Sequence, residues 1–149
     1  MKRQFGTFLT RLLRGATLTP AEHQIAERLV EELPNPLRDT VHSQFDAYNL
    51  VIREADGRAL NFYRLIHGKQ RPDSVPSFGM NGIAAPLIKM SFLALDDPNP
   101  IHATLTAVHG RAFCVSFNRR LDSYKTRLDL DTSRITRSWK SNIPHAEHV

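Results

Sequence analysis

Cysteine is almost absent from the sequence: Cys114 is the only one among 149 residues. One thiol excludes an internal disulfide and a thiolate cluster for structural zinc, and it favours a reducing compartment, which we predict to be the cytoplasm. No apolar run approaches the ~18 residues that a membrane-spanning helix needs. Hydrophobic residues make up 41% of the chain and charged residues 23%, which is typical of a globular protein. We therefore expect a single domain over residues 1–149.

Acidic residues are absent before Glu22, although the chain begins with several cations. The apolar residues of this region follow the spacing of one helix face, and Arg11 and Arg14 interrupt the apolar core that a secretory signal requires. Residues 1–18 are therefore predicted to form a basic amphipathic segment. Docking on the core, targeting as a transit peptide, and peripheral contact of residues 1–14 with an anionic membrane are its three interpretations.

Short signatures of catalysis and cofactor binding are absent as well. Gly68-Lys69 lacks the other residues of a P-loop, and no GxGxxG, HExxH, EF-hand loop or GxSxG occurs. His145 and His148 could share a metal with Glu147 only if the end of the chain ordered itself around the ion. We therefore predict no metal site and no cofactor, and we favour a protein that is not an enzyme.

Two helices are predicted early in the chain. Thr19-Pro20-Ala21-Glu22 combines an N-cap, a proline at the first helical position and a capping-box glutamate, so a helix is expected from there to about Leu33. Asn35-Pro36 repeats the cap and proline and predicts a second helix that ends near Ala47. The expected buried faces are Ile25, Leu29, Val30 and Leu33 in the first helix, and Leu37, Val41, Phe45 and Tyr48 in the second.

Two hairpins are predicted from alternating apolar residues on either side of a glycine-containing turn. A three-residue loop at residues 55–57 would pair Ile52 with Leu60 and give the first hairpin one apolar face. A two-residue loop would instead set Arg53 against Leu60. By the same reasoning, a loop at residues 108–110 pairs Leu105 with Phe113 in the second hairpin.

The remaining segments are assigned by pattern and length. Residues 86–95 are apolar on both faces, as in a strand covered on both sides, and residues 124–132 alternate like a charged edge strand. Residues 68–85 form an overlong connection, for which we expect a partly ordered loop with one helical turn. Residues 133–149 show no sustained period and are predicted to be a loose C-terminal tail.

These elements define an α+β fold class. Two or three N-terminal helices are expected to pack on one face of a mainly antiparallel sheet of about six strands, built from two hairpin or meander units. Strong curvature of the sheet is one form of this arrangement. In element order alone, it is similar to the cone-shaped folds of the nuclear-transport-factor-2-like group, which wrap a curved sheet around N-terminal helices.

Two sets of candidate site residues follow from the sequence. A basic stretch with an aromatic residue inside it is the predicted partner-binding surface, because cations contact phosphates and a ring stacks on bases. Polar and aromatic residues near the sheet are the candidates for a pocket or a polar face, and His102 beside Cys114 could activate a thiolate. The first set is Arg119, Arg120, Lys125, Arg127, Arg134, Arg137 and Trp139; the second is Tyr48, Asn61, Tyr63, His102, Cys114 and Ser116.

The leading functional hypothesis is a small non-enzymatic binding or regulatory protein that contacts another macromolecule. The favoured partner is another protein, as for an immunity or inhibitor protein. One alternative is a small-molecule-binding or enzymatic pocket between the helices and a curved sheet. A second alternative is nucleic-acid binding through the basic C-terminal stretch. The oligomeric state is left open.

Overall fold

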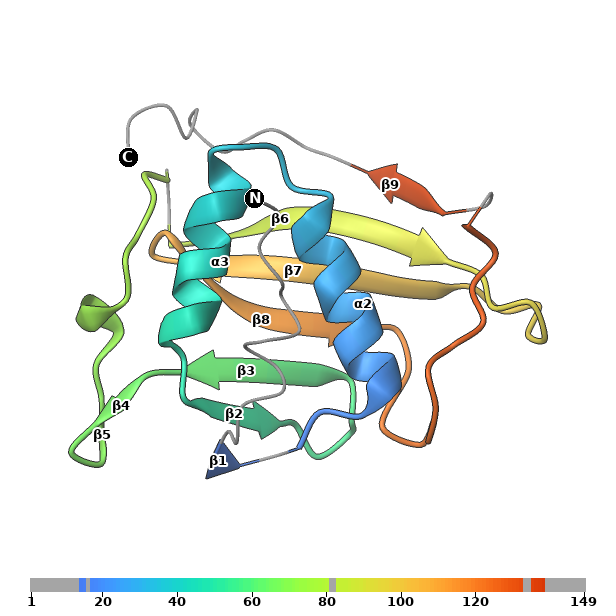
Figure 1. The fold of residues 1–149 in the computed structure, drawn as a ribbon, viewed down its shortest axis with the longest axis horizontal. Coiled ribbons are helices and arrows are strands. Elements are labelled where there is room, and N and C mark those ends of the chain that lie inside the picture. The colour runs from blue at the N-terminus through green and yellow to red at the C-terminus, as the bar shows by residue number, and fades with distance from the viewer. Residues whose placement is uncertain (1–13, 16, 81–82, 133–134, 139–149) are drawn as a thin grey trace.

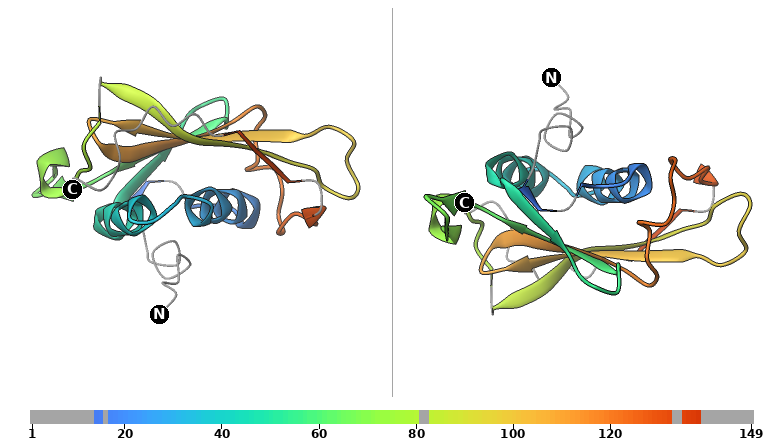
Figure 2. Two further views of the ribbon diagram at one scale, coloured as in Figure 1. Left: turned by 90° about the horizontal axis from the view of Figure 1, so that it is seen from above. Right: turned by 90° about the horizontal axis from the view of Figure 1, so that it is seen from below.

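The computed structural model describes residues 14–15, 17–80, 83–132 and 135–138. In these residues, helices α2 (Pro20–Glu31) and α3 (Leu37–Ala47) cover one face of a mainly antiparallel sheet, and no described helix lies on its other face (Figures 1 and 2). The predicted α+β class is confirmed, although the sheet is not notably curved. None of the described helices is long and apolar enough to cross a membrane.

The described part of the sheet has seven strands in the order β1-β2-β3-β8-β7-β6-β9. The β1–β2 pair is parallel, and the other neighbours are antiparallel. A separate two-stranded ribbon, β4–β5, extends from the end of β3 (Figure 1). The strands are β1 (Arg14–Gly15), β2 (Leu50–Arg53), β3 (Ala59–Tyr63), β4 (Leu65–Ile66), β5 (Lys69–Gln70), β6 (Ala84–Phe92), β7 (Ile101–Val108), β8 (Arg111–Phe117) and β9 (Thr136–Ser138).

Both helices form where the sequence predicts them. The capping box of α2 is present: the Thr19 hydroxyl accepts from the Glu22 amide, and the Glu22 carboxylate accepts from the Thr19 amide. The N-cap of α3 is Pro36 rather than the expected Asn35, and no side chain caps that helix. All eight residues of the two predicted faces are buried, and the Phe45 ring packs edge-on against Phe62 with ring centroids 4.9 Å apart.

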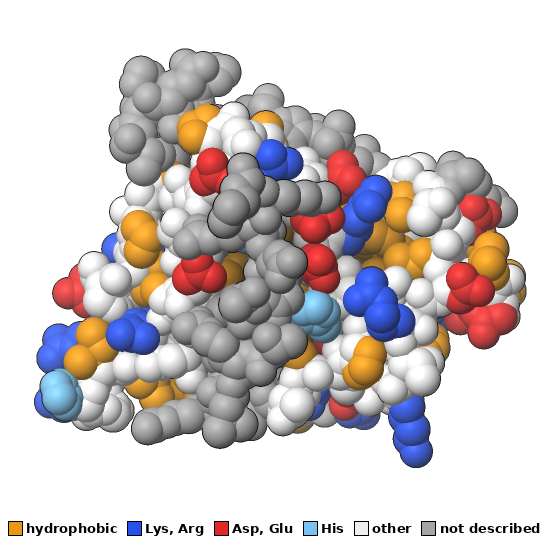
Figure 3. Space-filling view, viewed as in Figure 1, with side chains coloured by type: hydrophobic (Ala, Val, Ile, Leu, Met, Phe, Trp, Pro, Cys, Tyr) orange, Lys and Arg blue, Asp and Glu red, His pale blue; other side chains and the backbone are white. Residues whose placement is uncertain are grey.

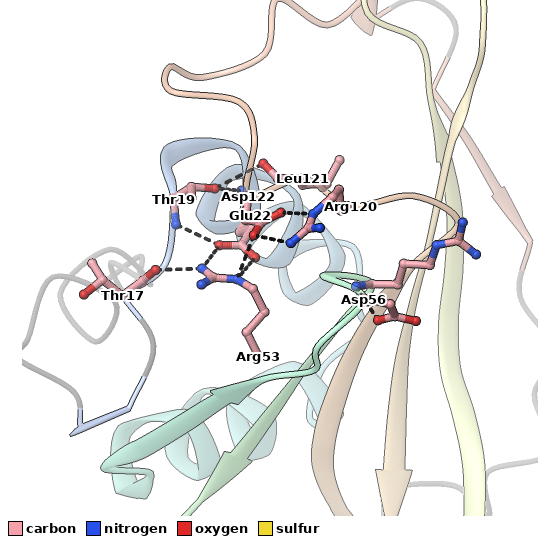
Figure 4. Close-up of polar contacts among 9 residues, drawn as sticks. Thr17, Thr19, Glu22, Arg53, Asp56, Arg120, Leu121 and Asp122 are labelled. Carbon is pink, nitrogen blue, oxygen red and sulfur yellow. Dashed lines mark hydrogen bonds and ion pairs between the residues drawn. The ribbon is translucent and has the colours of Figure 1, made fainter.

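The predicted register of the first hairpin was wrong. Val51 lies opposite Phe62 and Arg53 opposite Leu60, which is the register rejected for mixing polar and apolar side chains. The mixture is stable because Arg53 forms an ion pair with the fully buried Glu22 of α2, with Nε 2.8 Å from Oε2. Figure 4 shows this ion pair at the start of α2. A contact between distant parts of the chain therefore decides the register.

The predicted register of the second hairpin was also wrong. His109 and Gly110 form a two-residue turn with positive φ angles of 51° and 76°, so Val108 pairs with Arg111. The ladder then changes register between Thr106 and Ala107, and Phe113 becomes the extra residue of a β-bulge.

The long connection contains the expected helical turn, a 3-10 helix at Pro72–Ser74 that follows β5. Val75 and Phe78 are buried in the core and anchor the connection to the sheet. The Phe78 amide donates to the carbonyl of Gly110 at 2.9 Å. A Cβ atom at Gly110 would lie 2.1 Å from the Phe78 carbonyl oxygen, so this close approach and the positive φ both require glycine.

Other assignments need correction at the two ends and at the sheet edge. Strand β6 overlaps the predicted segment but ends at Phe92 rather than at residue 95, and it is not covered on both faces, because Lys89 is exposed. Residues 124–132 are not an edge strand; Leu130 makes one isolated bridge to Ala94. The tail predicted at residues 133–149 contains β9, which pairs with β6. The helix predicted in the N-terminal segment lies outside the described residues except at its end, where Arg14 belongs to β1.

Candidate functional site

A pocket opens at the end of β3, where that strand separates from β8. The β3–β8 ladder ends at the pair Asn61–Cys114. The bulged residue Phe113 is the next residue of β8 toward the β7–β8 turn. Phe62 and Tyr63 continue to pair with β2 beyond that point but no longer pair with β8. The bulge therefore creates a gap between two neighbouring strands, at the same end of the sheet as the β7–β8 turn.

Side chains of α3 fill the inner side of this gap. The Ala112 amide donates to Gln44 Oε1 at 2.8 Å, and the Tyr48 hydroxyl donates to the Ala112 carbonyl. The Gln44 amide group donates to the carbonyls of Pro76 and Gly110, each at 2.9 Å. Gln44 is fully buried and bonds through both ends of its amide. It therefore links the helix, the β7–β8 turn and the long connection. These bonds fix the position of the backbone at Ala112 and Gly110, which we call the pocket floor.

The pocket has a volume of about 410 Å³, which lies within the range of small-molecule sites. Aromatic rings dominate its walls, and Tyr63 packs edge-on against Phe113 with ring centroids 5.2 Å apart. Burial raises the pKa of Tyr48, which stays protonated and can donate its hydroxyl hydrogen as observed. The lining residues are Tyr48, Phe62, Tyr63, Arg64, Gln70, Pro72, Asp73, Val108, His109, Arg111 and Phe113.

Two arginines of the lining are fixed by backbone carbonyls. Arg111 donates to the carbonyl of Val75 at 2.8 Å, and Arg64 donates to the carbonyl of Ala47 at 3.1 Å. Among the described residues, no carboxylate forms an ion pair with either guanidinium, whereas Arg53 and Arg119 each pair with an acid. The positive charge of Arg111 also acts on Tyr48, because it opposes the rise in the tyrosine pKa. The pocket therefore presents two positioned cations, and Asp73, the one acid of its described lining, forms no ion pair with either of them.

The candidates of the polar face do not form a catalytic pair. Thr106 lies opposite Cys114, and the backbone of His102 bonds to Asn118. The two residues of the proposed thiolate pair are thus further apart along the sheet than predicted. His102 Nδ1 lies 2.6 Å from the hydroxyl of Ser91 instead.

Cys114 is expected to be unreactive at neutral pH. Burial raises the pKa of its thiol to about 11, and the charge of Glu54 adds to the rise. At pH 8 the thiolate fraction, and with it the rate of iodoacetamide labelling, should be about a hundredfold lower than for a thiol with a pKa of 9. The labelling rate of the native protein should rise up to pH 11, and urea should restore fast labelling at pH 8. Fast native labelling at pH 8 would contradict the burial argument.

The other predicted pocket residues divide between the pocket and the open sheet face. Tyr48 and Tyr63 line the pocket, whereas Asn61 does not and instead donates to Glu54 at 3.3 Å. Ser116 lies opposite Thr104 on the face away from the helices, because it alternates with the buried Val115. Of the six candidates for a pocket or a polar face, the structure thus brings Tyr48 and Tyr63 together at the pocket.

In its described part, the predicted basic stretch contains arginines that are paired with aspartates. Arg119 pairs with Asp97 at 2.8 Å, and Arg120 binds Asp122 through two hydrogen bonds. Lys125 and Arg127 are exposed. Arg134 and Trp139 lie outside the described residues; Arg137 belongs to β9.

Most of the pocket was not recognised in the sequence. Arg64 precedes the β4–β5 ribbon, whereas His109 lies in the β7–β8 turn and Arg111 directly after it, so no sequence spacing links them. The one available signal was the overlong connection, which contributes Gln70 and Asp73 to the lining. The fold and the site together define the class of this protein. It is a two-layer α+β protein that has a pocket at one end of the sheet and one sheet face free of described helices. Comparison of the chain with protein-family models, with curated proteins and with solved structures gave no match.

Proposed function

We propose that this protein binds a small molecule with an apolar ring and an anionic group in the pocket between β3 and β8. The observation that supports the proposal most strongly is the combination of aromatic walls with Arg64 and Arg111, whose charges no described acid neutralises. Both arginines are half-buried, and their guanidiniums are held in place by backbone carbonyls, so an anionic ligand in the pocket can form charge-assisted hydrogen bonds with both of them. The apolar walls supply the remaining affinity through burial of the ring.

Binding without chemistry is the simplest function for this arrangement. Catalysis would require a nucleophile or a general base beside the bound ligand. Tyr48 is kept protonated by burial, and its hydroxyl donates to the Ala112 carbonyl, so it is not a base. His109 and Asp73 line the pocket without a hydrogen-bonded partner nucleophile among the described residues. We therefore favour a non-enzymatic protein that binds a small molecule, which corresponds to the first alternative of the sequence analysis rather than to its leading hypothesis.

Naphthalene-1-carboxylate and the uncharged naphthalene-1-methanol test the proposal as a matched pair. In amide NMR spectra of the ¹⁵N-labelled chain, the carboxylate should shift signals of Phe62, Tyr63 and Phe113. Arg111→Met should weaken carboxylate binding about tenfold, because a charged hydrogen bond contributes about 1.5 kcal/mol or more. Binding of the alcohol should change little.

Two control variants separate charge from folding. Arg111→Lys keeps a positive charge and should retain part of the affinity for the carboxylate. Arg58→Met removes an exposed arginine at the opposite end of β3 and should leave binding unchanged. Shifts that map away from the pocket, or equal binding of carboxylate and alcohol by the wild-type chain, would count against the proposal.

Contact with another macromolecule is the broader form of the leading hypothesis. The described part of the predicted basic stretch supports it less than the pocket supports a small ligand, because Arg119 and Arg120 are paired with aspartates. A cytoplasmic location is also part of the proposal: Cys114 is a free thiol, and a free thiol persists in a reducing compartment.

A further inference from the structure

A basic arm borders the pocket. We define the basic arm as residues 64–74, which form β4, β5 and the 3-10 turn, with the Arg71 amide bonded to the Arg64 carbonyl at its base. All of its residues from position 67 onward are exposed. Figure 3 shows Lys, Arg and His side chains gathered at the end of the molecule that β4 and β5 form.

The charge of the basic arm exceeds what one carboxylate ligand needs. Lys69 and Arg71 add two cations to Arg64, and Asp73 is the arm's one acid. Arg64 lines the pocket itself, and Lys69 and Arg71 are the chain neighbours of Gln70, which also lines it, so these two cations lie next to the pocket lining but outside it. A ligand that carries several negative charges outside its ring makes the best use of this field.

The rim of the pocket also carries hydrogen-bonding groups of both kinds. The Gln70 amide can donate and accept, the His109 imidazole does both when neutral, and the Asp73 carboxylate accepts. A heteroaromatic base needs such a mixed set along its edge, and its faces stack on aromatic side chains such as Tyr63 and Phe113. A fatty acid offers one charge and no polar edge, so it would leave these groups unused.

We infer that the ligand is a mononucleotide, with the base in the aromatic pocket and the phosphates on Arg64, Arg111 and the basic arm. The inference rests on the proposed function and names its ligand class. Because Lys69 and Arg71 lie on the arm, they serve the outer phosphates and not the ring. Nucleoside triphosphates should therefore bind more tightly than monophosphates, and monophosphates more tightly than nucleosides.

Calorimetric titration with adenosine, AMP and ATP tests the inference. The dissociation constant for ATP should be about tenfold or more below that for adenosine at low salt, and this difference should shrink as salt is added. Amide shifts caused by ATP should include both the pocket residues and the basic arm. Inorganic triphosphate alone should bind more weakly than ATP, because it lacks the base.

A pair of double variants locates the phosphate contacts. Lys69→Ala/Arg71→Ala should bring ATP affinity close to that of AMP and leave naphthalene-1-carboxylate binding unchanged. Lys125→Ala/Arg127→Ala removes two exposed cations outside the pocket lining and should leave both unchanged.

The outcomes separate the two proposals. Binding of naphthalene-1-carboxylate in the pocket without binding of nucleotides would overturn the nucleotide inference and leave the proposed function intact. Failure of both ligands would overturn both. Equal affinity for ATP and inorganic triphosphate would show a site for polyanions on the arm and would overturn the inference, as would loss of ATP binding in the Lys125→Ala/Arg127→Ala variant.

Discussion

Replacement of Arg53 by methionine is expected to lower the free energy of unfolding by about 3 kcal/mol, because it leaves the carboxylate of Glu22 buried without its cation. Glu22 is fully buried, and Arg53 bonds to both of its carboxylate oxygens. Arg53 also donates to the Thr17 carbonyl at 2.7 Å, so the variant loses a third contact. The value lies at the lower end for broken buried pairs because Arg53 is itself partly exposed. Urea unfolding followed by circular dichroism measures the change.

Two further variants test whether the lost charge is the cause. In Glu22→Gln/Arg53→Met, the amide oxygen can still accept from the Thr19 amide, and no buried charge is left, so the double variant should be more stable than Arg53→Met alone. Arg120→Met removes an exposed arginine of the same network and should cost much less. Equal losses of unfolding free energy for Arg53→Met and Arg120→Met would show that the buried charge of Glu22 does not determine the stability of this network.

Replacement of Gln44 by methionine is expected to lower the free energy of unfolding by about 2–3 kcal/mol. The buried Ala112 amide and the part-buried Pro76 carbonyl both lose their bond to Gln44; an unpaired buried group costs about 1–3 kcal/mol, and most of the loss comes from the Ala112 amide. The Gly110 carbonyl is affected less because it still accepts from the Phe78 amide. Methionine has a similar length, so little of the loss arises from an empty volume.

Hydrogen exchange at the Ala112 amide provides the local readout for Gln44→Met, since this amide loses its acceptor and should exchange faster than in the wild-type chain. Binding of naphthalene-1-carboxylate should also weaken, because Gln44 fixes the position of the pocket floor through its hydrogen bonds. Gln70→Met is the control: this glutamine is exposed on β5, and its loss should change stability by less than about 0.5 kcal/mol. Unchanged Ala112 exchange in Gln44→Met would argue against the floor described above.

Local signals in the sequence predicted the elements that depend on local physics. The start of α2 follows from Thr19, Pro20 and Glu22, whose side chains and ring satisfy or remove the first amides of the helix. The buried faces of both helices and the inner face of β7 follow from apolar periodicity. The helical turn in the long connection was also expected, because its length exceeds that of an ordinary loop.

Strand register was not predictable in the same way. Apolar pattern alone disfavours Arg53 on the inner face, and only the approach of Glu22 from α2 makes that position stable. In the second hairpin, the turn at His109 and Gly110 is compatible with its sequence, but the bulge at Phe113 depends on α3 side chains that bond to Ala112 from outside the sheet. Most of the candidate pocket was missed for this reason, since the bulge is what opens it.

Cys114 illustrates the difference between what the sequence determined and what only the tertiary structure decided. The sequence by itself determined that the chain has one thiol and no internal disulfide, and it determined the α+β order of helices and strands, because both depend on composition and on contacts between near neighbours. Only the tertiary structure decided that this thiol is half-buried and lies away from His102, and that Arg64 and Arg111 meet at one pocket. Register, burial and the meeting of charges depend on packing between distant segments, and no local pattern in the chain encodes that packing.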